Sequence, residues 1–219
     1  MKGKYLLESI EIERARRLKG LKVVDTNALH LWNKVLKLLG TNNDKSEILK
    51  AYSFAKKIDY KHEGLNPDIY FAHPLRVASY SFLHVQPNNL DILIIGLIHN
   101  IFELSNYSRD DIQTLFGEKI KNQISNLTVN RALQYDSKYK YEYYRNIING
   151  PFEARVVKVF DKIDNLFTLS LNPDDSVREK YLKEIEEYVL PMAKRDLPLI
   201  FDYISELVRF NYKVGYLTK

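Results

Sequence analysis

Apolar residues recur along most of this chain at the three- and four-residue spacing of amphipathic helices. The segment 48–58 follows the i, i+3, i+4, i+7 pattern, and the same spacing returns after Gly117 at Ile120, Ile124 and Leu127. Strand-like alternation is short wherever it occurs. Eight glycines and seven prolines in 219 residues are few, which also favours long helices. The pattern predicts an all-α protein, a single helical bundle of about nine or ten helices with little or no sheet.

Short polar signals mark where several of these helices begin or bend. Ser108 and Asp111 have the spacing of a capping box, in which the hydroxyl and the carboxylate each accept a backbone N–H. Gly117 is expected to break the chain after that start. Pro151 can open a helix that runs through Leu171, because the first turn does not need its missing N–H.

The segment from Leu90 to Phe102, LDILIIGLIHNIF, is apolar on nearly every side. It predicts a central helix that is buried on most of its surface. His99 and Asn100 lie inside this segment, and Glu103 follows one turn beyond His99 on the same face. Buried polar groups need partners, so other parts of the chain must supply them.

Two further polar residues interrupt apolar helices: His73 in YFAHPL and Asp161 in VKVFDK. Taken alone, each is more often a hydrogen-bonded core residue or one half of an ion pair with a lysine. Taken together with His99 and Asn100, they could surround one divalent metal, and zinc, manganese or iron accepts such a donor set. Such a metal would acidify a bound water, and Glu103 could orient that water or take its proton.

The order and spacing of these segments resemble the HD-domain metal-dependent phosphohydrolases. The resemblance is strongest to the hydrolase half of RelA/SpoT-type enzymes, which remove pyrophosphate from the 3′ side of (p)ppGpp. It runs from about residue 48 to residue 193. The matching segments are AYSFA at 51–55, YFAHPLRVA at 70–78, GLIHNIFE at 96–103, Phe116-Gly117, Leu127-Thr128, DKIDNL at 161–166 and YLKEIEEYVLPMA at 181–193.

The resemblance implies an HD-type domain, a divalent metal, for which we expect Mn²⁺, and a role for individual residues. The implied metal ligands are His73, His99, Asn100 and Asp161. Glu103 is the acidic residue that acts on the attacking water. The implied nucleotide contacts are Asn165 and Thr168, and helical spacing places both on the face of Asp161. Lys158 and Lys61 are candidate phosphate contacts, with a solvated surface lysine as the alternative interpretation of Lys158.

This sequence departs from the family pattern at three places. The usual His-Asp pair is His99-Asn100, which removes one negative charge from the ligand set and predicts weaker metal binding. The usual Glu-Asp pair is Glu103-Leu104, so one acidic residue near the water is missing. The loop 63–69 is short and contains two acids and no base, which favours a smaller or less charged phosphoester than (p)ppGpp.

Two regions lie outside these motifs. We predict that residues 1–42 form a helical extension packed on the same domain as residues 43–219, with a partner-binding or dimer surface as the alternative. The segment 135–144 contains five tyrosines interleaved with basic residues. Aromatic and basic side chains can grip a nucleotide, although such a segment is more often a half-exposed amphipathic helix. Only one helix follows residue 195, so we expect no synthetase activity.

Composition limits the remaining choices. There is no cysteine, which excludes disulfides and thiolate zinc sites. The net charge is +5, which permits an anionic ligand without requiring one. The longest apolar run, Ile92–Ile98, is too short to span a membrane. Glu8 and Glu11 occupy positions where a signal peptide would be apolar, so we expect a cytoplasmic protein with no membrane partner.

Three hypotheses therefore remain for function. The first is a metal-dependent phosphohydrolase that acts on a nucleotide or related phosphoester through a metal-activated water. The second is a degenerate domain that binds a nucleotide without turnover, motivated by Asn100 and Leu104. The third is a basic helical adaptor for protein or nucleic acid with no metal, and nucleic acid is the least expected partner. A homo-oligomer is compatible with all three.

Overall fold

A computed structural model describes residues 9–39, 43–85 and 89–216, and within these ranges the chain is helical with no strand. The prediction of an all-α fold is confirmed. Ten of the helices in these ranges have eight or more residues. The α-helices are α1 Ile10–Gly20, α2 Thr26–Leu38, α3 Asn43–Lys56, α4 Pro67–Tyr70, α5 Ala72–His84, α6 Asp91–Ile98, α7 Ile101–Leu104, α8 Arg109–Leu127, α9 Ser137–Ile148, α10 Phe152–Leu166, α11 Asp175–Glu184, α12 Leu190–Asp196 and α13 Pro198–Val214.

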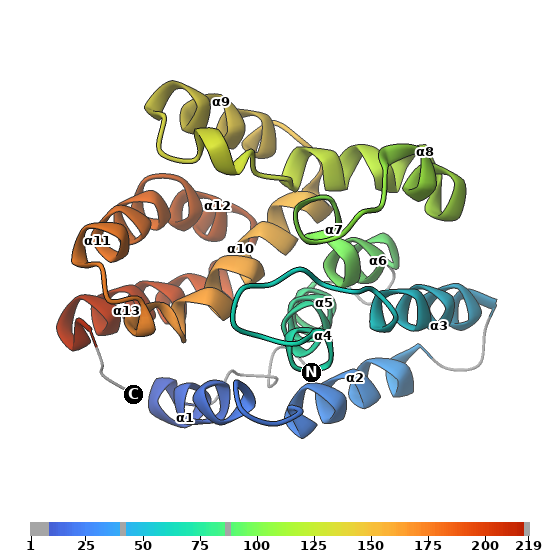
Figure 1. Ribbon diagram of the computed structural model, residues 1–219, viewed down its shortest axis with the longest axis horizontal. Helices are drawn as coiled ribbons and strands as arrows, with labels where there is room; N and C mark the ends of the chain where they lie inside the picture. Colours follow the sequence, from blue (N-terminus) through green and yellow to red (C-terminus); the bar gives the residue numbers. More distant parts are fainter. Residues whose placement is uncertain (1–8, 40–42, 86–88, 217–219) are drawn as a thin grey trace.

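Three helices form the centre of the bundle. Helix α10 runs through the middle of the molecule, with α5 and α6 on one side and α12 and α13 on the other (Figure 1). Both α6 and α10 are buried along nearly their whole length, as expected for apolar helices at the middle of a bundle. None of the helices in the described ranges has the length and apolar character needed to cross a membrane.

The predicted central helix 90–102 is shorter than expected. Helix α6 ends at Ile98 and α7 begins at Ile101, so His99 and Asn100 form a connection between them. The ring Nδ1 of His99 lies 2.8 Å from the carbonyl oxygen of Gly96. A continuing helix would offer that carbonyl to the amide of Asn100, so the imidazole competes with the backbone for it.

Local sequence signals predicted where helices begin more accurately than where they end. The capping box at Ser108 and Asp111 is present, and Gly117, with φ +84°, bends α8 as predicted. The helix predicted from Pro151 through Leu171 is wrong in its last turn. Helix α10 ends at Leu166 and a separate 3₁₀ turn covers Leu169–Leu171. Pro151 itself is the N-cap rather than a first-turn residue.

Helices α1 and α2 pack on the central helices. Helix α2 lies along α5. Arg14 and Arg17 of α1 donate hydrogen bonds to Ser170 and to Asp164 of α10. Two basic residues of α1, Arg14 and Arg17, therefore contact the body of the protein. The division at residue 42 stays a prediction, and its residues 1–8 and 40–42 lie outside the described residues.

Gly96 allows α6 to approach α5 closely. A Cβ at this position would lie 2.5 Å from the Cα of Ala78, far inside van der Waals contact. We expect Gly96→Ala to lower the free energy of unfolding by about 2 kcal/mol, because the two helices must move apart. Urea denaturation will measure the change. Gly20→Ala is the control, since its Cβ would meet Asp25 at an ordinary 3.5 Å. Equal stability of the two variants would contradict this account.

Candidate metal centre

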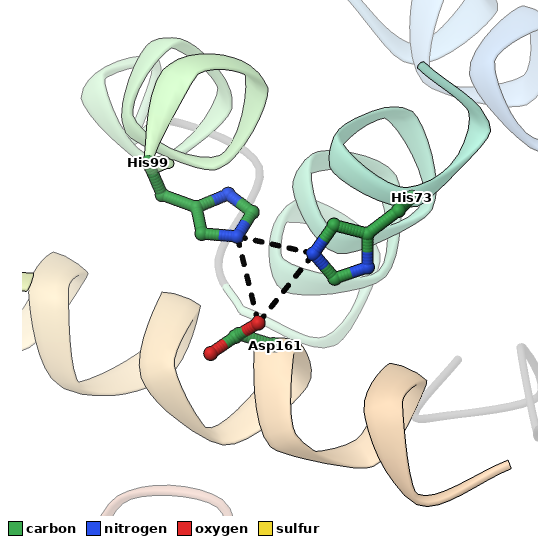
Figure 2. A group of neighbouring side chains, drawn as sticks. All are labelled: His73, His99 and Asp161. Atoms are coloured by element: carbon green, nitrogen blue, oxygen red, sulfur yellow. Dashed lines mark hydrogen bonds and ion pairs between the residues drawn. The ribbon is translucent and has the colours of Figure 1, made fainter. Parts of the chain in front are cut away.

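Three side chains from three helical segments converge at the centre of the bundle. His73 lies in the first turn of α5, His99 directly follows α6, and Asp161 lies in the second half of α10. Figure 2 shows one atom of each pointing at the same place. The Nε2 atoms of His73 and His99 are 3.3 Å apart, and each is 3.5 Å from Oδ1 of Asp161.

Hydrogen bonds on the far side of each ring determine which nitrogen faces this point. Nδ1 of His73 lies 2.8 Å from a carboxylate oxygen of Asp164, and Nδ1 of His99 lies 2.8 Å from the carbonyl oxygen of Gly96. Burial opposes ionisation of Asp164, but Arg76 and Arg17 outweigh it and hold its pKa well below the usual range. Both partners therefore accept, both Nδ1 atoms donate, and Nε2 is left to bind a metal.

The spacing of the three atoms fits a single divalent ion. Metal–nitrogen and metal–oxygen bonds of about 2.0–2.2 Å place neighbouring ligand atoms roughly 3.0–3.5 Å apart. The second oxygen of Asp161 lies 3.2 Å from Nζ of Lys158, and Asn165 donates to Oδ1 at 2.9 Å. These contacts fix the carboxylate in place. Two imidazoles and one carboxylate suit zinc, manganese or iron, so the residues fit the divalent metal that the resemblance implies.

Without a metal, protons compete for the same atoms. Burial disfavours a charged His73, but its hydrogen bonds to Asp161 and Asp164 outweigh burial and raise its pKa. Burial also opposes ionisation of Asp161, yet Lys158 and the two histidines hold its pKa well below the usual range. The metal-free group is therefore an ionised carboxylate beside a readily protonated imidazole, and a metal must displace that proton.

Asn100 lies beside the three converging atoms. Its Nδ2 is 3.4 Å from Nε2 of His73 and donates to the hydroxyl of Tyr70 at 2.8 Å. Burial raises the pKa of Tyr70, so the phenol keeps its proton. If the amide is turned by 180°, its oxygen accepts from Tyr70 and faces the metal position instead. In that orientation Oδ1 would be available as a fourth ligand, and the role of Asn100 as a ligand stays a prediction.

Lys158 is not the solvated lysine of the alternative interpretation. It is 5% exposed, its Nζ contacts Asp161, and it lies 5.4 Å from the centre of the Tyr143 ring. Burial alone would lower its pKa, but Tyr143 and Asp161 outweigh burial and raise it well above the ordinary value. A permanent positive charge therefore lies directly behind the candidate metal position.

A cavity of about 910 Å³ opens over this group. That volume suits a small-molecule ligand of nucleotide size. Of the residues predicted for the site, the following line the cavity: His73, Asn100, Glu103, Lys158, Asp161, Asn165 and Thr168. Besides Lys158, six cations line it: Arg17, Arg76, Arg131, Lys140 of the tyrosine-rich segment, Lys162 and Lys180. The cavity thus joins the candidate metal centre to several basic side chains.

Glu103 has partners for both carboxylate oxygens. Oε1 accepts from the amide of Val129 at 2.9 Å, and Oε2 pairs with Arg131 at 2.8 Å. The Glu103 side chain is 5% exposed, whereas that of Arg131 is 66% exposed. Glu103 is therefore held in one orientation at the cavity wall by a backbone amide and an accessible cation.

Two predicted site residues do not line the cavity: His99, which is buried behind it against His73, and Lys61. The side chain of Lys61 is 56% exposed and pairs with Asp59. The neighbouring loop does line it, through His62, Glu63, Gly64 and Leu65. The loop thus contributes an acid, Glu63, to the cavity lining. The role of Lys61 as a phosphate contact has no geometric support.

The tyrosine-rich segment divides into two groups. Tyr135, Tyr139, Tyr143 and Tyr144 line the cavity, but Tyr141 points to solvent and is 54% exposed. The hydroxyl of Tyr144 donates to Glu184, which also pairs with Lys140 and Lys162. Burial opposes ionisation of Glu184, but Lys162 and its other partners lower its pKa to about 2. Because part of this segment lines the cavity, its role in gripping a nucleotide stays a prediction.

Sequence reasoning missed the residues behind His73. Asp164 accepts from the ring of His73 and also from Arg76, which donates at 2.8 Å to each carboxylate oxygen. Arg76 follows His73 by three residues, and Asp164 follows Asp161 by three. A charged residue one turn from each predicted ligand, on the same buried face, was the available signal.

Comparison with known proteins identifies relatives that are similar to this chain. No model of a known protein family matches the chain. A guanosine-3′,5′-bis(diphosphate) 3′-pyrophosphohydrolase of Aquifex aeolicus is 29% identical over 153 residues, 68% of this chain and 21% of the relative. The GTP pyrophosphokinase rsh of Brucella melitensis is 28% identical over 152 residues, 67% of this chain and 20% of the relative. The chain thus spans about a fifth of the length of these curated relatives.

One solved structure shares the fold. It is described as a metazoan ortholog of SpoT that hydrolyzes ppGpp and plays a role in starvation responses. The match has a TM-score of 0.61 at 19% identity and covers 75% of this chain and 95% of that chain. The chain thus has the all-α fold of that structure and contains a candidate divalent-metal centre. The predicted resemblance to the hydrolase domain of RelA/SpoT-type proteins is confirmed.

Proposed function

We propose that this chain is a metal-dependent phosphohydrolase, similar to the (p)ppGpp 3′-pyrophosphohydrolases, that acts on a nucleotide or related phosphoester. One observation carries the proposal. The metal-binding atoms of His73, His99 and Asp161 converge at the wall of a cavity of about 910 Å³ that is lined by several cations. The activity named for the Aquifex relative is the chemistry that such a site can perform.

The residues that would hold the metal are His73, His99 and Asp161, with Asn100 through its amide oxygen. The carbonyl and carboxylate oxygens in this set favour Mn²⁺ over softer ions, and we propose Mn²⁺ as the working metal. When bound, the ion supplies Lewis-acid assistance to a phosphoryl oxygen and an acidified water as the nucleophile.

The remaining residues act on the substrate and on the proton. Glu103 accepts the proton of the attacking water, and Arg131 with the Val129 amide keeps its carboxylate in position. Asn165, one turn after Asp161 in α10, and Thr168, just beyond the end of α10, contact the nucleotide. The cations Lys140, Lys162 and Lys180 attract phosphate groups. Glu63 of the loop repels them, so we propose that the phosphates of the substrate lie against these lysines.

We expect Glu103→Gln to lower turnover by 10² to 10⁴, the usual contribution of one proton-transfer group. The amide keeps an oxygen for the Val129 N–H but cannot take a proton from water. Because Glu103 is not in the metal set, affinity for Mn²⁺ should stay within about twofold. Steady-state phosphate release and Mn²⁺ titration give the two readouts. Unchanged turnover would remove Glu103 from the mechanism.

A second candidate function is nucleotide binding without turnover. The specific observations that favour it are the amide at Asn100, the apolar Leu104 and the engagement of both Glu103 oxygens by other groups. Metal analysis of protein purified without chelator, with a screen of phosphate and pyrophosphate release in Mn²⁺, separates the two. About one metal per chain with turnover supports the hydrolase, and metal with nucleotide binding but no turnover supports the binding domain. Absence of any metal after reconstitution would contradict both.

A further inference from the structure

Four N–H groups from two helices, α1 and α5, converge on the carboxylate of Asp164 in α10. Oδ2 takes the ring N–H of His73 and one Arg76 N–H, both at 2.8 Å. Oδ1 takes Nε of Arg76 at 2.8 Å and Nε of Arg17 at 3.0 Å. Two oxygens with about four acceptor sites are thereby filled. The carboxylate has no freedom to rotate without losing one of these bonds.

Arg17 comes from α1, which the sequence analysis placed outside the motif-bearing segment. Its side chain is 3% exposed. A second guanidinium nitrogen pairs with Glu13 at 3.0 Å, and the guanidinium group lies 5.2 Å from the centre of the Phe167 ring. An arginine buried this deeply is held by both of its carboxylate partners and by an aromatic face. Arg17 also lines the cavity, but Nε and one terminal nitrogen are already taken by these two carboxylates.

Arg76 shows why Arg17 is needed. A single arginine could hold Asp164 alone, but the third nitrogen of Arg76 donates at 2.7 Å to Asp25. Asp25 is the N-cap of α2 and accepts the amides of Asn27 and Ala28 with its other oxygen. Arg76 is thus shared between two carboxylates. Arg17 supplies the remaining N–H to Oδ1 and the second positive charge beside Asp164.

We propose that Arg17 is a positioning residue for the metal ligand His73, acting through Asp164, so that α1 forms part of the metal centre. The proposal rests on the metal site of the proposed function. With Arg17 removed, Oδ1 loses one N–H and Asp164 loses one of its two positive neighbours, so its hold on the ring of His73 rests on Arg76 alone, which also donates to Asp25. Partners behind a ligating histidine commonly change metal affinity by 10- to 100-fold. Arg17 is one contact further away, and we expect the lower end of that range.

The test measures metal affinity rather than activity. Co²⁺ replaces the working metal because its visible absorption reports the ligand geometry. The variants are Arg17→Met, which keeps the length of the side chain, and Arg17→Lys, which keeps the charge but has one ammonium for two carboxylates. Lys19→Met is the control, since Lys19 lies in the same helix and is exposed. Each full-length protein is titrated with Co²⁺, and its metal-free melting temperature is recorded separately.

We expect Arg17→Met to bind Co²⁺ about tenfold more weakly with an altered absorption spectrum, Arg17→Lys to be intermediate, and Lys19→Met to match the wild type. A lower melting temperature with unchanged affinity and spectrum would reduce Arg17 to a structural residue and overturn the proposal. If Arg17→Met does not fold, the Co²⁺ affinity and absorption spectrum of Arg17→Lys test the proposal in its place, and wild-type values for both would overturn it. Failure of the wild type to bind Co²⁺ would instead refute the metal site itself, and with it the proposed function.

Discussion

Asp161→Asn is expected to weaken Mn²⁺ binding by about 10³-fold and to reduce turnover at least as far. Asp161 is the one negatively charged residue among the four proposed ligands. The loss of one charge close to a cation in this environment is equivalent to about 4 kcal/mol. The change also leaves Lys158 buried without its carboxylate partner, which should lower the stability of the metal-free protein by about 3 kcal/mol. Mn²⁺ titration and urea denaturation give the two values.

A matched control separates the two effects. Glu153 lies in the first turn of the same helix, and its carboxylate accepts from Asn89 at the edge of the bundle. Glu153→Gln removes the same charge from α10 and should leave Mn²⁺ affinity unchanged. If Asp161→Asn lowered only stability and bound Mn²⁺ like the wild type, the three converging side chains would be a structural cluster and no metal site.

Asn100→Asp is expected to raise affinity for Mn²⁺ by about 10²-fold. The new carboxylate would lie beside Asp161 and His73, where the amide nitrogen now lies 3.4 Å from Nε2 of His73. A second negative charge attracts the cation and is itself costly when no metal is present, and both effects favour the metal-bound form. Turnover should rise with it wherever metal occupancy limits the rate. Titration with Mn²⁺ at fixed pH measures the gain.

Asn106→Asp adds the same charge at an exposed position after α7 and is the control. Equal affinities of wild type and Asn100→Asp would exclude Asn100 from the ligand set. Stronger binding without any turnover, in a screen that includes (p)ppGpp, would favour the binding domain over the hydrolase. The variant therefore tests both the metal site and the choice between the two proposed functions.

The fold followed from local patterns to a large extent. Apolar periodicity and few chain breakers predicted helices, and the capping box at Ser108 and the bend at Gly117 occur as the sequence indicates. The break at His99 and Asn100 was not predicted. It depends on a side chain that takes a backbone carbonyl, and periodicity contains no information about that competition.

The candidate site was predictable where a polar residue interrupts an apolar helix. His73, His99 and Asp161 lie together as expected from that signal. Charges with long-range partners were not predictable in the same way. Lys158 was given a solvated alternative because lysines are mostly exposed, and Arg17 in the N-terminal extension was given no role. Their burial depends on carboxylates brought near by the fold, Asp164 being 147 residues from Arg17.

The double role of Asp25 has a practical consequence for work with shorter pieces of this chain. One oxygen of Asp25 caps α2 and the other holds Arg76. A fragment that begins at residue 43, just before the family resemblance starts, would lose Asp25 and Arg17 together. It would retain Asp164 at the back of His73 with one arginine instead of two. Truncations made for crystallisation or screening should therefore begin before Ser9, even though every proposed ligand lies well beyond it.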